Sequence, residues 1–180
     1  MSKSLVERIR NHDQRAMSEL YQQYVGRLSS VCYRYVPSDS DAKDVLQNSF
    51  VKIFKAMQTF EYRNEPSFEG YLVRVVVNEA LSFLKSQKKL LFVDIQQAAS
   101  MKSEDGEPEP ERITSDELHQ LISELPTGYR TVLNLYVFEG CSHKKIAELL
   151  GIKETTSATQ LYHAKWQLKR KMMDLMEKRR

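Results

Sequence analysis

The stretch TGYRTVLNLYVFEGCSHKKIAELLGIKETTSATQLYHAKWQLKRK, residues 127–171, decides the fold of the C-terminal part of the chain. Its first third carries apolar residues at helical spacing and ends at Gly140, which predicts a lead-in helix. Ser142 then offers a side-chain oxygen to cap a short second helix. Gly151 follows where the chain has to turn sharply, and a long third helix begins after it. The pattern therefore predicts a helix-turn-helix.

The third predicted helix has two different faces. The face that we expect to be buried comprises Leu161, Ala164, Leu168, Met172 and Leu175. The face that we expect to be exposed carries short polar, amide and cationic side chains, namely Thr156, Thr159, Gln160, His163, Gln167 and Arg170. Such side chains suit phosphates and base edges in a DNA major groove. The alternative is the solvated face of an ordinary helix in a bundle.

Composition narrows the range of functions. The chain has 180 residues and a net charge of only +3, so contact with nucleic acid has to come from local clusters of cations. We find no apolar run long enough to cross a bilayer, and the N-terminus MSKSLVERIRNHDQ is too polar for a signal peptide. We therefore expect a cytoplasmic protein without membrane insertion.

The residues that could support catalysis or bind a metal are scattered. The chain has four histidines, and no Asp, Glu or His cluster has metal-ligand spacing, so we expect no enzyme, no cofactor and no small-molecule substrate. His143 is interpreted as helix surface. Cys32 and Cys141 lie near apolar helical patterns and lack ligand spacing, which predicts two buried free thiols in a reducing compartment.

The N-terminal part also has helical patterns. Residues 5–36 predict two helices, and VPSDSDAK, residues 36–43, predicts the start of a third that runs to about Met57. The third helix carries a compact polar patch of Asp44, Gln47, Asn48 and Lys52. A patch of this kind is either plain surface or a docking site. The segment TFEYRNEPSFEG, residues 59–70, is interpreted as a loop rich in aromatic and amide groups, which can hold an unstacked base.

A further helix, expected over residues 71–89, carries an aromatic ring, an amide and several cations along one ridge. The ridge comprises Tyr71, Arg74, Asn78, Ser82, Lys85 and Lys89. In a groove for single-stranded DNA the ring stacks on a base, the amide reads a base edge and the cations follow the phosphates. The alternative is again a solvated face.

The segment SEDGEPEPE, residues 103–111, contains five acidic residues, two prolines and a glycine. This composition predicts a mobile linker. Its acidity suits either a nucleic-acid mimic or simple solubility. A short helix over residues 116–125 opens the C-terminal part, and strand-like alternation is absent. We expect an all-α protein with two small helical domains and a flexible acidic linker, bounded as 1–90, 91–112 (the linker) and 113–180.

Three stretches, in this order, resemble the RNA polymerase sigma factors of the extracytoplasmic-function group, within the sigma-70 superfamily. DAKDVLQNSFVKIF (41–54) is similar to the family's helix that binds core polymerase, and FEGYLVRVVVNEALSFLK (68–85) is similar to its promoter-melting helix. Residues 125–165, which include the helix-turn-helix, resemble the domain that reads the minus-thirty-five element. The resemblance covers residues 15–90 and 115–172, which is nearly the whole chain.

The resemblance implies roles for individual residues. Those expected to bind core polymerase are Asp44, Gln47, Asn48 and Lys52. Those expected to meet minus-ten DNA are Arg63, Asn64, Ser67, Phe68, Tyr71, Arg74, Asn78 and Lys85. Among these, Asn78 matches an asparagine that lines the pocket for a flipped base, with the loop 63–68 as its wall, and Tyr71 stands where tryptophan is common.

For the minus-thirty-five element the implied residues are Lys153, Thr156, Ala158, Thr159, Gln160, Tyr162 and His163. Thr156 matches a phosphate-contacting threonine, and Thr159, Tyr162 and His163 match positions that meet bases. Ala158, Gln160 and His163 stand where arginine or lysine is frequent. Lys153 occupies a position where Ser or Asp normally caps the helix, and the lost cap should cost about 1 kcal/mol.

The implied function is recruitment of RNA polymerase. The family's members bind core polymerase and direct promoter-specific initiation, with upstream DNA held by the C-terminal domain and the minus-ten region melted by the N-terminal domain. The implied partners are core RNA polymerase, promoter DNA and an anti-sigma factor. The alternative is a helix-turn-helix regulator that works without polymerase, but it gives no role to the patch at 44–48 or the ridge at 71–89.

Overall fold

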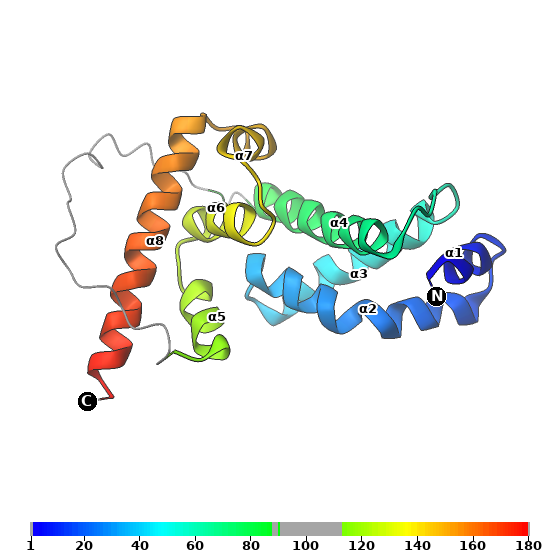
Figure 1. Cartoon of the computed structure of the whole chain (residues 1–180), viewed down its shortest axis with the longest axis horizontal. Helices are drawn as coiled ribbons and strands as arrows, with labels where there is room; N and C mark the ends of the chain where they lie inside the picture. The colour runs from blue at the N-terminus through cyan, green and yellow to red at the C-terminus, as the bar shows by residue number, and fades with distance from the viewer. Residues whose placement is uncertain (1, 88–89, 91–112, 180) are drawn as a thin grey trace. The chain divides into compact units, whose positions relative to one another are not determined.

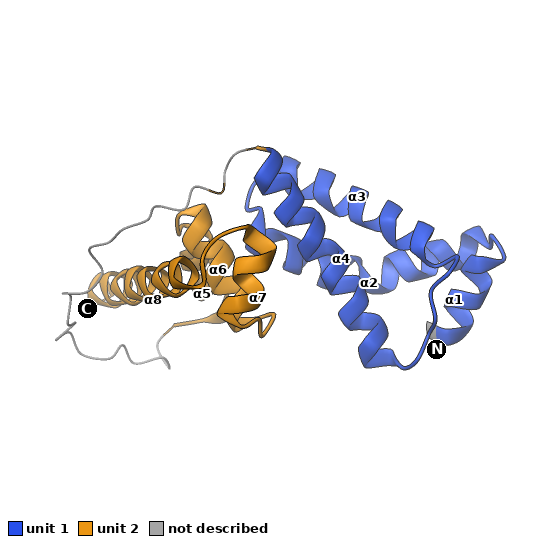
Figure 2. Ribbon diagram, turned by 90° about the horizontal axis from the view of Figure 1, so that it is seen from above, with its two compact units in different colours: residues 1–86 blue, residues 87–180 orange. Residues whose placement is uncertain are grey.

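All the regular structure in the described residues is helical, as the sequence predicts. The computed structural model describes residues 2–87, 90 and 113–179, and within them it contains α1 to α8 and no strand (Figure 1). The chain divides into two compact units, residues 1–86 and 87–180 (Figure 2). The predicted linker, residues 91–112, lies outside the described residues.

Unit 1 is a bundle of three long helices with a short helix at its N-terminus. Its helices are α1 (Ser2–Arg10), α2 (Gln14–Tyr35), α3 (Asp39–Ala56) and α4 (Glu65–Ser86). α2, α3 and α4 pack against one another in every pairing, and α1 packs against α2 (Figure 1). The centre of the bundle is filled by large side chains that are almost completely buried, among them Leu20, Leu28, Tyr35, Ile53, Phe68 and Leu72.

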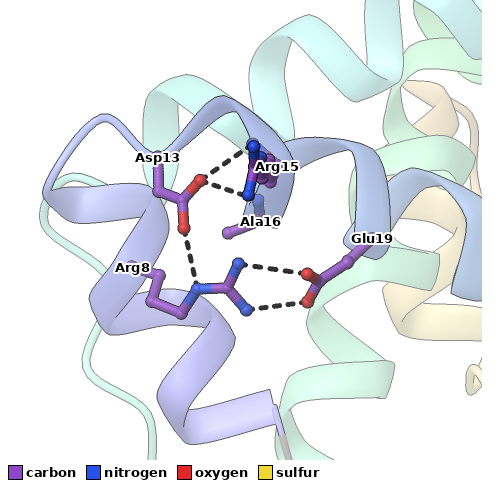
Figure 3. Close-up of polar contacts among 5 residues, drawn as sticks. All are labelled: Arg8, Asp13, Arg15, Ala16 and Glu19. Carbon is purple, nitrogen blue, oxygen red and sulfur yellow. Dashed lines mark hydrogen bonds and ion pairs between the residues drawn. The ribbon is translucent and has the colours of Figure 1, made fainter.

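The turn between α1 and α2 is fixed by hydrogen bonds from both sides. His12 adopts a left-handed conformation (φ 61°). The N–H of His12 donates to the carbonyl of Ile9, and the N–H of Asp13 donates to the carbonyl of Arg8. These two bonds form a Schellman motif at the end of α1. The Asp13 carboxylate then caps α2 by accepting from the N–H groups of Arg15 and Ala16. Figure 3 shows the two bonds that the Asp13 carboxylate accepts from Arg15 and Ala16.

The same turn carries an ion-pair network on its surface. The Arg8 guanidinium donates twice to Glu19, at 2.8 and 3.0 Å, and once to Asp13, at 2.8 Å (Figure 3). The hydrogen bond to Glu19, and to a smaller extent the one to Asp13, raises the pKa of Arg8. The hydrogen bond from Arg8 lowers the pKa of the Asp13 carboxyl. Since these groups are solvent-exposed, they orient α1 more than they stabilise it.

The fourth helix begins earlier than the sequence pattern indicates. The segment 59–70 was predicted to be a loop throughout, yet α4 starts at Glu65. Asn64 acts as its cap, because its Oδ1 accepts from the N–H of Ser67 at 2.9 Å. Pro66 lies in the first turn, where a missing N–H costs nothing, so the proline does not break the helix here.

Unit 2 contains the predicted helix-turn-helix. Its helices are α5 (Ser115–Ser123), α6 (Thr127–Val137), α7 (His143–Leu150) and α8 (Glu154–Glu177). α5, α6 and α7 all pack against α8, the long helix of the unit (Figure 2). α5 is joined to the C-terminal part of α8 by ion pairs of Glu124 with Lys171, at 2.7 Å, and of Glu117 with Arg179.

A buried arginine closes the connection from α5 to α6. The Nη1 atom of Arg130 donates to the carbonyl of Ser123 at 2.9 Å and to that of Leu125 at 2.7 Å. The residue is 6 % exposed, and burial lowers its pKa. The guanidinium therefore satisfies carbonyl groups that the end of α5 leaves without helical partners.

Candidate functional site

The helix-turn-helix has the capping geometry that its sequence predicts. Ser142 accepts a hydrogen bond from the N–H of Lys145 at 3.2 Å and so begins α7. Gly151 ends α7 in a left-handed conformation (φ 71°), with its N–H bonded to the carbonyl of Ala147 at 2.8 Å. These two residues fix where α7 stops and where α8 can start.

A histidine joins the two helices of the motif. The Nδ1 atom of His143, at the start of α7, lies 2.9 Å from the Oγ atom of Ser157 on α8. The imidazole also stacks on the ring of Tyr136 in α6, with centroids 4.9 Å apart. The prediction that His143 is plain helix surface is therefore wrong, since the residue is half-buried among three helices.

The polar face predicted for α8 is partly wrong. Gln160 is only 1 % exposed and Thr156 only 8 %, although both were expected to face solvent. The N-terminal half of α8 packs against both α6 and α7, so two sides of the helix are buried instead of one. A pattern based on a single apolar stripe could not predict this second buried side, because Ser157 and Gln160 fill it with polar groups.

The exposed side of this half of α8 is displaced from the predicted face. Glu154 is exposed at the start of the helix, and after it the exposed residues follow steps of three and four, namely Thr155, Ala158, Tyr162 and Lys165. Ala158 and Tyr162 are predicted site residues, whereas Thr155 and Lys165 do not belong to the face that the sequence pattern predicts. The steps of three and four residues between these positions are the sequence signal that predicts a common helix face for them. Lys153, just before the helix, is exposed too and makes no side-chain cap.

Two other predicted residues lie at the edge of this exposed side. Thr159 is half-buried, and its hydroxyl donates to the carbonyl of Thr155 at 3.0 Å. His163 is half-buried as well and stacks on Tyr129 of α6, with centroids 5.7 Å apart. Both side chains are therefore oriented by the protein before any ligand is present.

In unit 1 the predicted patch on α3 lies in the open. Asp44, Gln47 and Asn48 are exposed, as is Lys52, whose ammonium pairs with Glu79 of α4. Beside the patch lies an apolar groove of about 450 Å³, which the sequence pattern does not predict. Its lining comprises Tyr21, Lys43, Leu46, Gln47, Phe50, Val51 and Phe54.

Two large apolar side chains on this groove are unusually exposed. Tyr21 on α2 is 44 % exposed and Val51 on α3 is 46 % exposed. The Tyr21 ring contacts that of Phe50, with centroids 4.7 Å apart. A polar patch next to exposed apolar groups is typical of a protein interface.

On α4 the predicted ridge is exposed along most of its length. Arg74, Asn78, Ser82 and Lys85 are exposed, while Lys89 lies outside the described residues. Tyr71, at the start of the ridge, is half-buried, and its ring lies 4.8 Å from that of Phe60. This burial raises the pKa of the Tyr71 hydroxyl.

Of the predicted loop residues, Arg63, Asn64 and Ser67 are exposed. The Oδ1 atom of Asn64 is already used to cap α4, so its amide N–H groups are the part open to a ligand. Phe68 was expected to contact DNA, but it is 0 % exposed and packs against Tyr24 and Phe60 in the core. Its expected contact with a base is therefore wrong.

The remaining candidate groups have no site geometry. Among the described residues no group of three or more His, Cys, Asp or Glu could hold a metal ion, and no helix in them is long and apolar enough to cross a membrane. Cys32 and Cys141 are free thiols, as predicted. Cys32 is buried, but Cys141 is half-buried, so its predicted burial is only partial.

Comparisons with known proteins cover both units. A family model for Sigma-70 region 2 matches residues 20–90, and one for Sigma-70 region 4 matches residues 115–168. The ECF RNA polymerase sigma-E factor of Salmonella typhimurium (strain LT2) is 31 % identical over 185 residues, covering 97 % of this chain and 95 % of the relative.

Two further similarities extend over nearly the whole chain. The ECF RNA polymerase sigma-E factor of Escherichia coli (strain K12) is 30 % identical over 185 residues, covering 97 % of this chain and 95 % of the relative. The solved structure of CnrH in complex with the cytosolic domain of CnrY is 19 % identical, with a TM-score of 0.49, and the match covers 95 % of this chain and 96 % of that chain.

Proposed function

Because the chain belongs to the sigma-70 family of RNA polymerase sigma factors, in its extracytoplasmic-function group, we propose a separate task for each of its two units. The protein is a promoter-directing sigma factor and not an enzyme, and its partners are RNA polymerase and promoter DNA. The reading as a polymerase-independent regulator is not favoured, since the region 2 match gives unit 1 a role of its own. We propose residues 1–90 and 113–180 as the two domains.

Unit 1 is proposed to bind core polymerase through α3. Asp44, Gln47 and Asn48 supply exposed polar contacts, and the groove next to them supplies apolar area through Tyr21 and Val51. A buried apolar centre with a polar rim is the usual composition of a stable interface. Lys52 is less free to contact the polymerase, because its ammonium pairs with Glu79.

The ridge of α4 is proposed to hold the melted minus-ten strand. Asn78 can bond a base edge, and Arg74 and Lys85 can follow the phosphates, with the exposed Arg63, Asn64 and Ser67 beside them as the wall of a pocket for a flipped base. Tyr71 is half-buried, so it offers only part of its ring for stacking. Phe68 is left out of this proposal, because it lies in the core.

Unit 2 is proposed to read the minus-thirty-five element with the exposed side of α8. The contacts come from Lys153, Thr155, Ala158, Thr159, Tyr162 and Lys165, with His163 at the edge. The observation that supports this most directly is that the N-terminal half of α8 is buried on two sides and leaves one side open, which carries Thr155, Tyr162 and Lys165. Gln160 is not part of this surface, and the role of Thr156 is limited to its backbone and the little of its side chain that remains exposed.

The group to which the chain belongs also suggests how its activity is controlled. We propose that the protein acts in the cytoplasm and that an anti-sigma factor holds it inactive. The exposed apolar groups Tyr21 and Val51 beside the polymerase-binding patch support this proposal, since a partner that covers them also prevents polymerase from docking.

The test combines size-exclusion chromatography with transcription in vitro. The purified chain should elute with core RNA polymerase and direct transcription from a subset of a pool of promoter fragments. Val51→Asp should weaken binding to polymerase, while Ser30→Asp, the same change of charge on an exposed part of α2 away from the patch and the groove, should not. The proposal would be refuted if the chain did not bind core polymerase and bound a promoter tightly in the absence of polymerase.

Each DNA surface has its own variant. Asn78→Ala should prevent promoter opening and leave polymerase binding intact, while Gln22→Ala on an exposed turn of α2 serves as the control. Tyr162→Ala should change the preferred upstream sequence, with Gln120→Ala on α5 as its control. Unchanged promoter opening would exclude Asn78 from the minus-ten contact, and an unchanged upstream preference would exclude Tyr162 from the minus-thirty-five contact.

A further inference from the structure

An arginine at the end of α1 contacts the loop beside the proposed base pocket. The Nη2 atom of Arg10 donates to the backbone carbonyl of Phe60 at 2.8 Å. Phe60 belongs to the segment 57–64 that connects α3 to α4, and Arg63 and Asn64 lie in the same segment. The region 2 model matches residues 20–90, so α1 lies outside the matched part of the chain.

The contacted residue also supports the ridge. The Phe60 ring lies 4.8 Å from that of Tyr71 and 5.5 Å from that of Phe68, measured between centroids. Its carbonyl thus bonds α1 while its side chain packs on α4. A shift of this one residue would move the connecting segment and the ring of Tyr71 together.

The other end of the connecting segment is fixed as well. The hydroxyl of Tyr24 on α2 donates to Oε1 of Glu65, and that of Tyr62 donates to Oε2, both at 2.8 Å. The bond to Glu65 raises the pKa of Tyr62. Between the anchors at Phe60 and Glu65 the exposed residues are Glu61, Arg63 and Asn64.

The helix that carries Arg10 is firmly seated. Leu5, Val6 and Ile9 are each at most 3 % exposed. The Arg8 network holds the end of α1 on α2 (Figure 3). The Schellman ending at His12 fixes the last turn, from which Arg10 projects. The arginine therefore bonds the loop from a rigid base.

We propose that Arg10 is a positioning residue for base capture at the minus-ten element. It holds the segment 57–64 in the conformation that receives a flipped base, so the loop need not be ordered when DNA binds. Tyr62 acts in the same way from the other end, through Glu65. This inference rests on the proposed role of the α4 ridge.

The test uses holoenzyme and fork-junction DNA with a single-stranded minus-ten segment, in which the captured base is varied. Arg10→Ala should weaken binding to the preferred fork roughly tenfold, as expected for the loss of one charged hydrogen bond. It should also reduce the discrimination among the four bases. Binding to core polymerase and to duplex minus-thirty-five DNA should stay unchanged.

Three variants make the result specific. Arg10→Lys keeps a donor and should restore part of the discrimination, and Tyr62→Phe should lower it without any change in α1. Arg15→Ala, an exposed arginine at the start of α2, is the matched control. Unfolding followed by circular dichroism checks that each variant keeps its fold.

The outcomes separate this inference from the proposed function. If Asn78→Ala removes base discrimination and both Arg10→Ala and Tyr62→Phe leave it intact, the positioning role is wrong and the ridge stands. If Asn78→Ala also leaves it intact, the role of the ridge itself is wrong. Loss of discrimination in Arg10→Ala at unchanged melting temperature, with partial recovery in Arg10→Lys, supports the inference.

Discussion

The Nδ1 atom of His143 and the Oγ atom of Ser157 lie 2.9 Å apart, and this contact joins the first residue of α7 to the first turns of α8. Ser157 is 0 % exposed, so water does not compete for the bond. The imidazole is held from its other side by Tyr136. The contact therefore sets the angle at which α8 leaves the turn and presents its exposed side.

We expect His143→Ala and Ser157→Ala to affect the same interaction. Each should lower the free energy of unfolding of unit 2 by about 1 kcal/mol, the usual net value of a hydrogen bond. The double variant should lose less than the sum of the two, because one bond is removed in all three proteins. Fluorescence of Trp166, the chain's one tryptophan, follows unfolding of this unit.

Lys144→Ala, on an exposed turn of α7, is the control for this cycle. Losses that simply add up would mean that the two side chains act independently.

At Lys153 stability and DNA binding are expected to change in opposite directions. Its backbone is in the cap position of α8, but its side chain makes no cap bond. Lys153→Asn should add about 1 kcal/mol to the free energy of unfolding, because the asparagine oxygen accepts from an N–H of the first turn. The same change removes a cation, so the slope of log affinity against log salt for minus-thirty-five DNA should fall by about 1.

Denaturant unfolding and salt titrations of holoenzyme measure the two effects separately. A slope that stays the same would exclude contact between Lys153 and phosphate, whatever happens to stability.

Local signals explain what the sequence could predict. The cap at Ser142 and the turn at Gly151 depend on residues close in the chain, so the helix-turn-helix could be predicted from spacing. The burial of Gln160 depends on two helices that close over α8 from different sides, which no single-helix pattern contains. The start of α4 was missed because Pro66 marks either a break or a first turn, and only the bond from Asn64 decides between them.

The contacts between distant residues were outside the reach of sequence patterns for a similar reason. Arg10 and Phe60 are fifty positions apart, and the acceptor is a backbone carbonyl, which has no sequence signature. The exposed groove of Tyr21 and Val51 likewise needs α2 and α3 in register. In each case the helices could be predicted but not their mutual packing.

The left-handed turn at His12 predicts a stabilising substitution. A non-glycine residue at φ 61° is strained, and glycine is not. His12→Gly should therefore raise the free energy of unfolding of unit 1 by roughly 0.5–1 kcal/mol. Hydrogen exchange of the α1 amides measures the local effect.

The matched control is Ser18→Gly, in the interior of α2. Glycine there should cost roughly 0.5 kcal/mol, since it gains flexibility in the unfolded chain without any relief of strain. If both substitutions destabilise the protein, the left-handed turn is not a source of strain.

The two thiols should differ in reactivity. Burial raises the pKa of Cys32 to about 12, so its reactive thiolate is nearly absent at neutral pH. Burial also raises the pKa of Cys141, but this residue is half-exposed and can be reached. Iodoacetamide should modify Cys141 first, with a rate that rises with pH, and should leave Cys32 intact until the protein unfolds.

Mass spectrometry of peptides from native and denatured protein distinguishes the two sites. Modification of Cys32 at the same rate as Cys141 in native protein would mean that unit 1 opens readily around α2.

Arg130 should be among the residues on which unit 2 depends most. Its guanidinium donates hydrogen bonds to the carbonyls of both Ser123 and Leu125, and the residue is 6 % exposed. Arg130→Met keeps most of the apolar volume and removes both bonds, so it should lower the free energy of unfolding by about 2–4 kcal/mol. Arg130→Lys should recover only part of this, since the shorter lysine side chain does not bring its ammonium to the position from which Nη1 bonds both carbonyls. Trp166 fluorescence during denaturation measures the series, and equal stability of the Met and Lys variants would show that packing, not hydrogen bonding, is the contribution of Arg130.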